Sequence, residues 1–339
     1  MSKLDSFNSS VGGIQMNVAR QALIILLTQL LLSMFPVSHV VGIISHRNEE
    51  NISGNHLAEL RKKAERGNAD SQYDLGIMYV LGKKVPRDYW KAAMWFRKAA
   101  EQGHAYAQSN LGYMCMRGEG VPQDYKKGTM WFRKAAGQGN VHAQFNLGNM
   151  YRKGEGLAQD SKKAVMWFRK AAEQGDIHAQ FNLGCMCRKG EGVAQDFKQA
   201  VIWFRKAAEQ GSASAQYALG RSYQIGEGAA QNYKEAVMWY KKAAEQGDSG
   251  AQNNLGVLYH TGEGGSQNFK EAAKWYKKAA EQGHCGAQNN LGVMYHIGEG
   301  VSQNYKEAAK WYTKAAENGD EDAQRNLEIL CNEIPFSCR

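Results

Sequence analysis

Proline is scarce in this chain, which holds 4 prolines but 37 glycines among 339 residues. Proline interrupts helices because its ring clashes with the preceding turn and it lacks a backbone donor. Glycine instead tolerates the left-handed backbone with which many helices end. Few prolines and many regularly placed glycines therefore indicate a chain of helices that end on glycine at fixed intervals.

Cysteine is also sparse, and its six copies show no repeating pair spacing. This excludes a regular disulfide framework. Cys185 and Cys187 form a C-x-C pair, but no second Cys or His cluster completes a zinc site, so we expect no metal and no cofactor. Cys115 and Cys187 replace tyrosine and are expected to be small buried hydrophobic residues. Cys331 and Cys338 would close a short loop in an oxidising compartment.

Catalytic motifs are absent from the sequence. It contains no S-x-x-K, H-E-x-x-H, G-x-S-x-G or phosphate-binding G-x-x-x-x-G-K pattern. The triplet G-E-G recurs six times, which suits a helix break and not a single active site. His142 and His178 are 36 residues apart, as are His260 and His296, so duplication explains them better than metal binding. We therefore expect a non-enzymatic protein.

Acidic residues are outnumbered, with 33 Asp and Glu against 42 Lys and Arg, for a formal charge of +9. A basic chain suits nucleic acid, an anionic surface or an acidic protein partner. Helical repeats that read RNA need a regular code at their binding positions. Here those positions change character halfway along the chain, so we expect no nucleic-acid partner.

The N-terminus carries the one long apolar run, ALIILLTQLLLSMF at residues 22–35. Its 14 residues are short for a spanning helix and suit the apolar core of a signal peptide. With the weaker stretch that follows, residues 22–44 nearly span a bilayer, although Pro36 interrupts them. Residues 1–45 are thus a signal peptide or a membrane anchor, starting at Met1 or Met16. The protein is then exported (secreted or periplasmic) or membrane-anchored, and residues 46–55 form a linker.

A strict 36-residue period governs the rest of the chain. It holds for eight leucines and seven tryptophans without a gap: Leu75, Leu111, Leu147, Leu183, Leu219, Leu255, Leu291 and Leu327, with Trp95, Trp131, Trp167, Trp203, Trp239, Trp275 and Trp311. A fixed period in this range is the signature of a solenoid. We predict an all-α superhelix of antiparallel helix pairs, with seven 36-residue units over residues 68–319.

Each unit shows the signals of two helices. In the third unit, a first helix over about residues 141–153 is broken by the glycines of residues 154–156. Asp160 then caps a second helix, and every other unit has Asp or Asn at that place. The second helix ends at Gly175. Small residues such as Ala143 and Gly148 recur where the helices must touch.

Single units of this size are too small to fold alone, so stacking must supply the core and the ends need caps. Residues 56–67 resemble a lone second helix and form the predicted N-terminal capping helix. Residues 320–339 supply a C-terminal capping helix and tail. In that helix Glu328 replaces the recurring glycine, as expected if nothing packs beyond it.

The motifs A-Q-x-N-L-G-x-M-Y, G-E-G-V-x-Q-D-Y and A-x-x-W-F/Y-x-K-A-A-E-Q-G resemble the Sel-1-like repeat family, which is related to the tetratricopeptide repeats. The resemblance covers roughly residues 56–332, and the first unit departs from it with Gly82-Lys83-Lys84. It implies a right-handed superhelix that acts as a scaffold or adaptor. Many bacterial members are exported. A cysteine-rich subfamily is described as binding or hydrolysing β-lactams, but its regular disulfide pairs are absent here.

The first helix has one constant and one variable face. Counting from its leucine, positions −4, 0, +1 and +4 recur, whereas positions −5, −2, +2, +5 and +6 vary on the opposite side. In tetratricopeptide-like arrays the first helix lines the concave groove, so the resemblance places the variable face there. Position −1 is a ladder of asparagines, which offer donors and acceptors to a peptide.

The middle units combine aromatic and basic groups on this face, whereas units six and seven are neutral, with His260, Thr261, His296 and Ile297. We therefore predict a groove for an acidic, partly apolar peptide or protein segment. The candidate groove residues are Asn110, Tyr113, Phe145, Asn146, Arg152, Lys153, Phe181, Asn182, Arg188, Lys189, Tyr217 and Arg221. The alternatives are a solvated, weakly used face, a membrane-anchored assembly scaffold, and the β-lactam activity of the cysteine-rich relatives.

Overall fold

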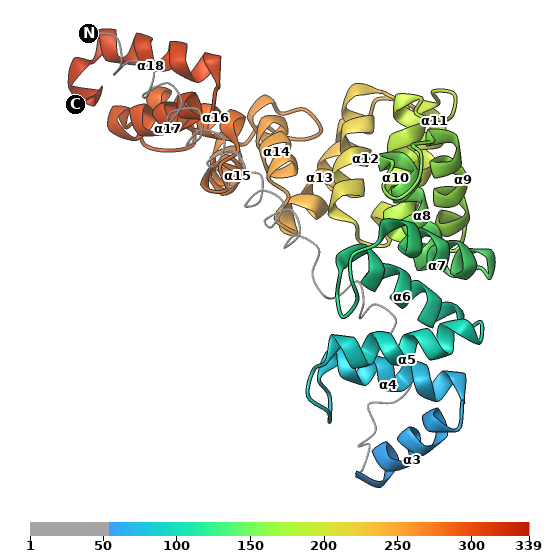
Figure 1. The fold of residues 1–339 in the computed structure, drawn as a ribbon. Coiled ribbons are helices and arrows are strands. Elements are labelled where there is room, and N and C mark those ends of the chain that lie inside the picture. Colours follow the sequence, from blue (N-terminus) through green and yellow to red (C-terminus); the bar gives the residue numbers. More distant parts are fainter. Residues whose placement is uncertain (1–53, 339) are drawn as a thin grey trace, which may run out of the picture. The chain divides into compact units, whose positions relative to one another are not determined.

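A computed structural model describes residues 54–338 of the chain, and the predicted signal peptide or anchor lies outside them. The chain divides into two units, Met1–Arg66 and Gly67–Arg339. The described element of the first unit is the helix α3 (Gly54–Glu65). The second unit contains a run of α-helices, α4 to α18, and a final 3-10 helix, η1 (Pro335–Cys338) (Figure 1). No strand occurs within the described residues, which confirms the predicted all-α class.

The helices of the second unit form consecutive pairs, and each of them is 13 residues long. The first helices are α4 (Ala69–Leu81), α6 (Ala105–Arg117), α8 (Val141–Lys153), α10 (Ile177–Lys189), α12 (Ala213–Ile225), α14 (Ser249–Thr261) and α16 (Cys285–Ile297). The second helices are α5 (Tyr89–Glu101), α7 (Tyr125–Gly137), α9 (Ser161–Glu173), α11 (Phe197–Glu209), α13 (Tyr233–Glu245), α15 (Phe269–Glu281) and α17 (Tyr305–Glu317). Each helix packs against its neighbours in sequence, which gives the predicted solenoid of antiparallel pairs.

Helix boundaries follow the signals read from the sequence. The Oδ1 atom of Asp160 accepts a hydrogen bond of 3.0 Å from the backbone N–H of Lys163 and caps α9. Asp or Asn caps the second helix of every other unit in the same way. At the other end, Gly154 closes α8 with a φ of 77°, and its N–H donates to the carbonyl of Met150. The predicted starts and stops in the repeats are therefore confirmed.

The second glycine of the G-E-G triplet has a role that the sequence did not disclose. Gly156 has a φ of 72°, and a Cβ there would lie 2.5 Å from the carbonyl oxygen of Tyr125 in the preceding unit. The five other triplets make the same close approach. The triplet is therefore both a helix end and the place where the backbones of adjacent units meet.

Small and large residues interlock inside each unit, as predicted. A Cβ on Gly148 would lie 2.6 Å from the ring of Phe168, and every unit repeats this pairing of a helical glycine with an aromatic ring. Ala143 and Leu147 are fully buried beside it. The core is thus a series of equivalent clusters along the stack.

Buried glutamines link the units and were overlooked in the sequence. Gln144 is 4% exposed, and its Nε2 donates to the carbonyl of Ala136 in the preceding unit at 3.3 Å. Its Oε1 accepts a hydrogen bond of 2.7 Å from Nε2 of Gln174, at the end of α9. A buried amide is costly unless its groups are paired, so this arrangement fixes the spacing of neighbouring units. The recurring A-Q dipeptide was the available signal.

The two ends differ slightly from the predicted boundaries. The helix α3 spans Gly54–Glu65 where residues 56–67 were expected, so helix replaces the last two residues of the predicted linker. The C-terminal helix α18 (Glu321–Glu333) agrees with the expected cap, and Glu328 on it is exposed. No helix among the described residues has the length and hydropathy needed to cross a bilayer.

The cysteines largely follow expectation. Cys115 and Cys187 are 4% and 3% exposed, which confirms them as small buried residues. Both are free thiols, as are Cys185 and Cys285. Cys331 is disulfide-bonded. The side chain of Cys338, the partner suggested by the sequence, lies outside the described residues.

Candidate functional site

A cavity of about 450 Å³ opens between the first helices of units four and five. It is bounded by α10 and α12 and by the residue that precedes α14. Eight residues line it: Phe181, Cys185, Arg188, Ser214, Tyr217, Ala218, Arg221 and Asp248. Four of them, Phe181, Arg188, Tyr217 and Arg221, are predicted groove residues that the structure brings together.

The cavity is built mainly from the variable positions of the repeat. Unit four contributes positions −2, +2 and +5, and unit five contributes positions −5, −2, −1 and +2. The sequence-based prediction omitted Cys185 and Ser214, although both occupy variable positions. It also omitted Asp248, which looked only like a helix cap. The variable face of the first helix therefore predicted where the cavity lies better than it predicted which residues line it.

A missing side chain explains why the cavity lies at this unit. Position −1 is asparagine in six of the eight first-helix segments, but in unit five it is Ala218, which is 6% exposed. Ala218 lines the cavity together with Phe181 and Arg221, and an asparagine side chain there would occupy part of its volume. In the next unit, Gly250 gives the Tyr217 ring room, because a Cβ there would lie 3.2 Å from its Cε2 atom.

Two half-buried aromatic rings form the apolar part of the cavity. The Phe181 ring centroid lies 5.9 Å from that of Phe204 in the same unit, and Tyr217 lies 5.8 Å from Tyr240. Each ring therefore packs on the second helix of its own unit while also lining the cavity. This contact fixes the orientation of both rings before any ligand binds.

The charge in the cavity is predominantly positive. Arg188 and Arg221 are half-buried, and neither forms an ion pair with a carboxylate among the described residues. The guanidinium of Arg188 lies 6.0 Å from the Phe204 ring centroid. Asp248 is the one acidic lining residue, and its Oδ1 accepts a hydrogen bond of 2.7 Å from Ala251 N at the start of α14. Two cations thus remain available to an anionic group.

Cys185 is a neutral lining group. Burial raises the pKa of its thiol above the usual range, and the nearby Arg188, Lys189 and Arg152 only partly oppose this shift. Because the thiolate is the nucleophilic form, the thiol behaves as a small hydrophobic residue at physiological pH.

Other predicted groove residues lie outside the cavity. Asn110 is a correction: it is 4% exposed and lies against the buried Tyr73 hydroxyl, so it cannot present its amide to a ligand. Neither of these two buried groups has a hydrogen bond of normal geometry. Burial raises the pKa of Tyr73 well above its usual range. Tyr113 is half-buried, with the Arg117 guanidinium 5.6 Å from its ring centroid.

Unit three has an aromatic and a basic residue at the positions that line the cavity in unit four, and it has Asn146 at position −1. The Nδ2 of Asn146 donates to the His142 carbonyl at 2.9 Å. Phe145 packs 5.9 Å from both the Phe168 and the His178 rings. Arg152 and Asn182 are half-buried, whereas Lys153 and Lys189 are exposed.

In units six and seven the asparagines pair with one another. The Nδ2 of Asn290 donates to Oδ1 of Asn253 at 3.2 Å, and the Nδ2 of Asn326 donates to Oδ1 of Asn289 at 2.9 Å. This amide ladder therefore joins neighbouring units. Within the described part of the chain, no group of three or more His, Cys, Asp or Glu side chains is placed to hold a metal ion.

Comparison with known proteins adds a family and a fold. The model of the family described as Sel1 repeat matches seven segments: residues 69–104, 105–140, 141–176, 177–212, 213–248, 249–284 and 286–320. A crystal structure of a protective antigen present in uropathogenic Escherichia coli strains, displaying an SLR fold, is 38% identical with a TM-score of 0.82. The alignment covers 85% of this chain but 62% of the antigen, so this chain spans less than two thirds of that relative.

A second similar structure is a Sel1 repeat protein from Oxalobacter formigenes. It is 38% identical with a TM-score of 0.64, and the alignment covers 83% of each chain. No curated protein matches the chain.

Proposed function

We propose, given that the chain belongs to the Sel1 repeat family, that it is a non-enzymatic scaffold or adaptor whose cavity between α10 and α12 binds an acidic, partly apolar segment of a partner protein. Helical repeats of this type generally mediate protein interactions. The observation that carries the finer proposal is the cavity itself, where two arginines without ion pairs lie beside two oriented aromatic rings.

The chemistry of the lining favours such a segment. An arginine offers a planar fork of donors that fits a carboxylate, and the half-buried positions of Arg188 and Arg221 strengthen that interaction relative to water. Phe181 and Tyr217 are already packed, so little side-chain entropy is lost when an apolar residue covers them. Aromatic residues and arginine are also the usual carriers of interface energy.

Binding without catalysis is the better supported alternative. The Cys185 thiol in the cavity is neutral, and the Asp248 carboxylate caps α14. The guanidinium groups of Arg188 and Arg221 suit the binding of an anionic group. The β-lactam activity of cysteine-rich relatives stays the weaker alternative, because the regular cysteine pairs of those proteins are absent from this sequence.

The place of action is part of the proposal. The apolar run within residues 22–44 supports either an exported protein or a membrane-anchored assembly scaffold. Mass spectrometry of the mature N-terminus distinguishes the two. A new N-terminus beyond residue 35 supports export with cleavage, and an intact apolar run supports the anchor.

The site is tested with acidic peptides, each containing one Phe or Leu, titrated against the full chain by fluorescence anisotropy. We expect Arg188→Glu with Arg221→Glu to weaken binding by about tenfold or more, since each reversal places a like charge against the peptide. Ala218→Asn restores the residue that most units carry and should fill the cavity without harming the fold.

The matched control is Lys270→Glu with Lys306→Glu, which makes the same change in net charge at exposed positions of α15 and α17, outside the cavity. Binding of the control is expected to stay within about threefold of the wild type. An equal loss in both double variants, or full binding by Ala218→Asn, would show that the cavity is not the site.

A further inference from the structure

The second helices carry a repeated pattern that the cavity does not use. In α7 an exposed apolar residue, Met130, is surrounded by basic residues at i−4, i−3, i+3 and i+4. These positions lie within about 60° of Met130 around the helix axis, because each residue turns by about 100°. The four basic residues are Lys126, Lys127, Arg133 and Lys134.

The same ring recurs in the neighbouring units. In α9 it surrounds Met166 with four basic residues, and in α11 it surrounds Ile202 with three basic residues and Gln199. Met130, Met166 and Ile202 are 43%, 43% and 44% exposed. Since one 36-residue step relates these helices and each makes equivalent packing contacts, the rings face the same side of the array. We call this surface, from α5 to α11, the second-helix face.

Unit one adds an exposed tryptophan to this face. Trp90 lies four residues before Met94 in α5, and its side chain is 64% exposed. The six later second helices have lysine at the equivalent position. Lys91, Arg97 and Lys98 complete its ring. Tryptophan among lysines and arginines is typical of side chains that lie at the boundary between lipid and water.

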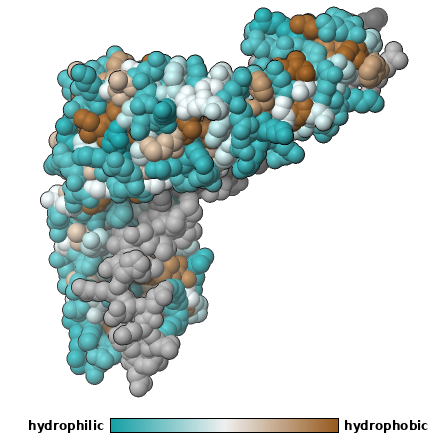
Figure 2. Space-filling view, turned by 180° about the vertical axis from the view of Figure 1, so that it is seen from behind, coloured by the Kyte–Doolittle hydropathy of each residue, from teal (hydrophilic) through white to brown (hydrophobic). Residues whose placement is uncertain are grey.

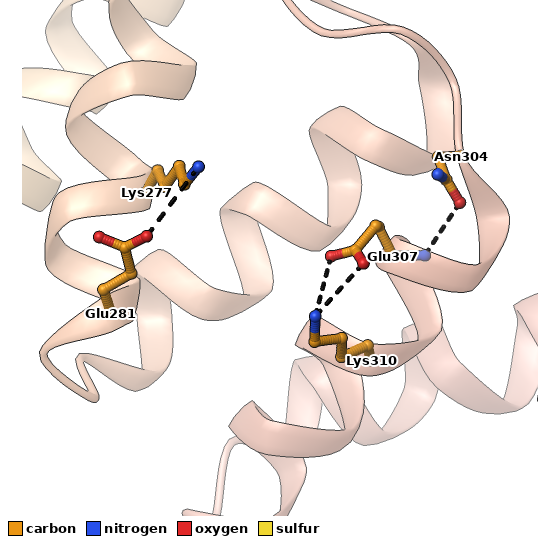
Figure 3. Close-up of polar contacts among 5 residues, drawn as sticks. All are labelled: Lys277, Glu281, Asn304, Glu307 and Lys310. Carbon is orange, nitrogen blue, oxygen red and sulfur yellow. Dashed lines mark hydrogen bonds and ion pairs between the residues drawn. The ribbon is translucent and has the colours of Figure 1, made fainter.

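The pattern weakens in α13, where Glu235 enters the ring around Met238, and it ends in the last two units. The central residue becomes Lys274 in α15 and Lys310 in α17, and acidic residues enter the ring. Lys310 pairs with Glu307 at 3.3 Å, and Lys277 lies 4.0 Å from Glu281 (Figure 3). In the last two units the face therefore loses its central apolar residue, and lysine–glutamate ion pairs lie in its place.

We propose that the second-helix face of α5, α7, α9 and α11 binds the surface of an anionic lipid bilayer. The three helices α7, α9 and α11 contain eleven Lys and Arg residues and two glutamates, Glu173 and Glu209. Lys127 and Lys163 pair with the capping residues Asp124 and Asp160 at 3.3 and 3.1 Å. Clustered basic residues are attracted to anionic headgroups, and exposed apolar side chains add partition into the interface.

A bilayer fits this face better than a peptide does. The central apolar residues Met130, Met166 and Ile202 lie on separate helices, one in each unit. Figure 2 shows one side of the molecule, where apolar patches are separated by hydrophilic residues. The ring pattern also repeats over four units and does not converge on one point. An extended anionic surface suits a pattern that repeats in this way.

Sedimentation of the full chain with lipid vesicles tests the proposal. Vesicles of phosphatidylcholine with 30% phosphatidylserine, roughly the charge of an anionic leaflet, are compared with pure phosphatidylcholine. The test variant is Lys126→Glu, Lys162→Glu and Lys198→Glu, which should lower partition to the anionic vesicles by about tenfold or more. Glutamate in the first turn of a helix suits the helix dipole, so the fold should tolerate it.

The matched control makes three Lys→Glu substitutions at exposed positions of units six and seven, as Lys270→Glu, Lys277→Glu and Lys306→Glu. Its net charge equals that of the test variant, and we expect it to retain partition within about threefold of the wild type. Equal losses in both triple variants would mean that only net charge matters and would overturn the proposal.

Trp90→Lys separates a bilayer from other anionic partners. It adds a positive charge but removes the exposed ring, so partition to the anionic vesicles should fall. If it rises instead, or if polyglutamate or an oligonucleotide binds with the same Lys126, Lys162 and Lys198 dependence while vesicles do not, a soluble polyanion is the partner and the proposal is wrong. Since both triple variants retain the whole cavity, failure here leaves the peptide-binding proposal intact.

Discussion

His104 shows how a single residue makes the fold sensitive to pH. It is the N-cap of α6, where its Nδ1 accepts a hydrogen bond of 3.1 Å from the backbone N–H of Ala107. A protonated imidazole cannot accept this bond. Burial is the main cause that lowers the pKa of His104, and the charges of Asp70 and Asp74 oppose it only in part.

The stability of the fold should therefore decrease as the pH falls below about 6.5. The unfolded histidine takes up a proton near its ordinary pKa of 6.5, whereas the folded one does so at lower pH, so acid favours the unfolded state. His104→Asn keeps a cap of the kind found at Asn140 and removes the titration. Its stability relative to wild type, measured by urea unfolding, should improve from pH 7 to pH 5.

His142 also has a pKa lowered by burial, so the variant should retain part of the acid dependence. A stability difference between wild type and His104→Asn that stays constant from pH 7 to pH 5 would contradict the capping argument.

At the scale of the element, the loop between the two helices of a unit contains two glycines that have different structural roles. Gly154 ends α8, whereas Gly156 allows the loop to touch the backbone at Tyr125. In the sequence the two glycines recur equally and cannot be told apart by role. Only the position of the preceding unit distinguishes them, because the close contact is formed between units.

Alanine substitutions should reveal this difference. Gly156→Ala combines a left-handed backbone with a clash against a carbonyl, so we expect it to lower the free energy of unfolding by about 3 kcal/mol or more. The control is Gly175→Ala, which also has a positive φ but has nothing within 4 Å of the new Cβ. It should cost about 1–2 kcal/mol. Similar losses in denaturant unfolding would argue against a steric joint at Gly156.

At the scale of the whole molecule, stability should depend on the interfaces between units. The glutamine of each first helix joins two consecutive units, as Gln180 does through Ala172 and Gln210. In such a quasi-one-dimensional array, a weakened central interface separates two blocks, whereas a weakened terminal one releases only the end.

Gln180→Leu should therefore reduce the cooperativity of unfolding, because it removes the hydrogen bonds to the Ala172 carbonyl and from Gln210, at a total cost of about 1–3 kcal/mol. We expect a lower denaturant m-value and loss of hydrogen-exchange protection on both sides of α10. Gln288→Leu makes the same change near the C-terminal end and should affect chiefly α16 to α18. Identical exchange patterns in the two variants would exclude a stack of separable interfaces.

The candidate site was only partly accessible from the sequence. Phe181, Arg188, Tyr217 and Arg221 could be grouped because they occupy variable positions on one helix face. The burial of Asn110 could not be foreseen, since it depends on Tyr73 of the preceding unit. The asparagine ladder likewise looked like a ligand surface, but Asn290 and Asn326 donate to the asparagines at position −2 of the preceding unit.

The sequence by itself determined the helices, their caps, the 36-residue unit and the number of repeats, because these depend on local backbone preferences and on a pattern that recurs without interruption. The tertiary structure alone decided which variable residues meet. It showed that Ala218 lines a cavity, that the glutamines and the second glycines join the units, and that Met130 and Met166 are exposed. These features depend on how neighbouring helices and units pack, and a repeat pattern specifies them only after that packing has formed.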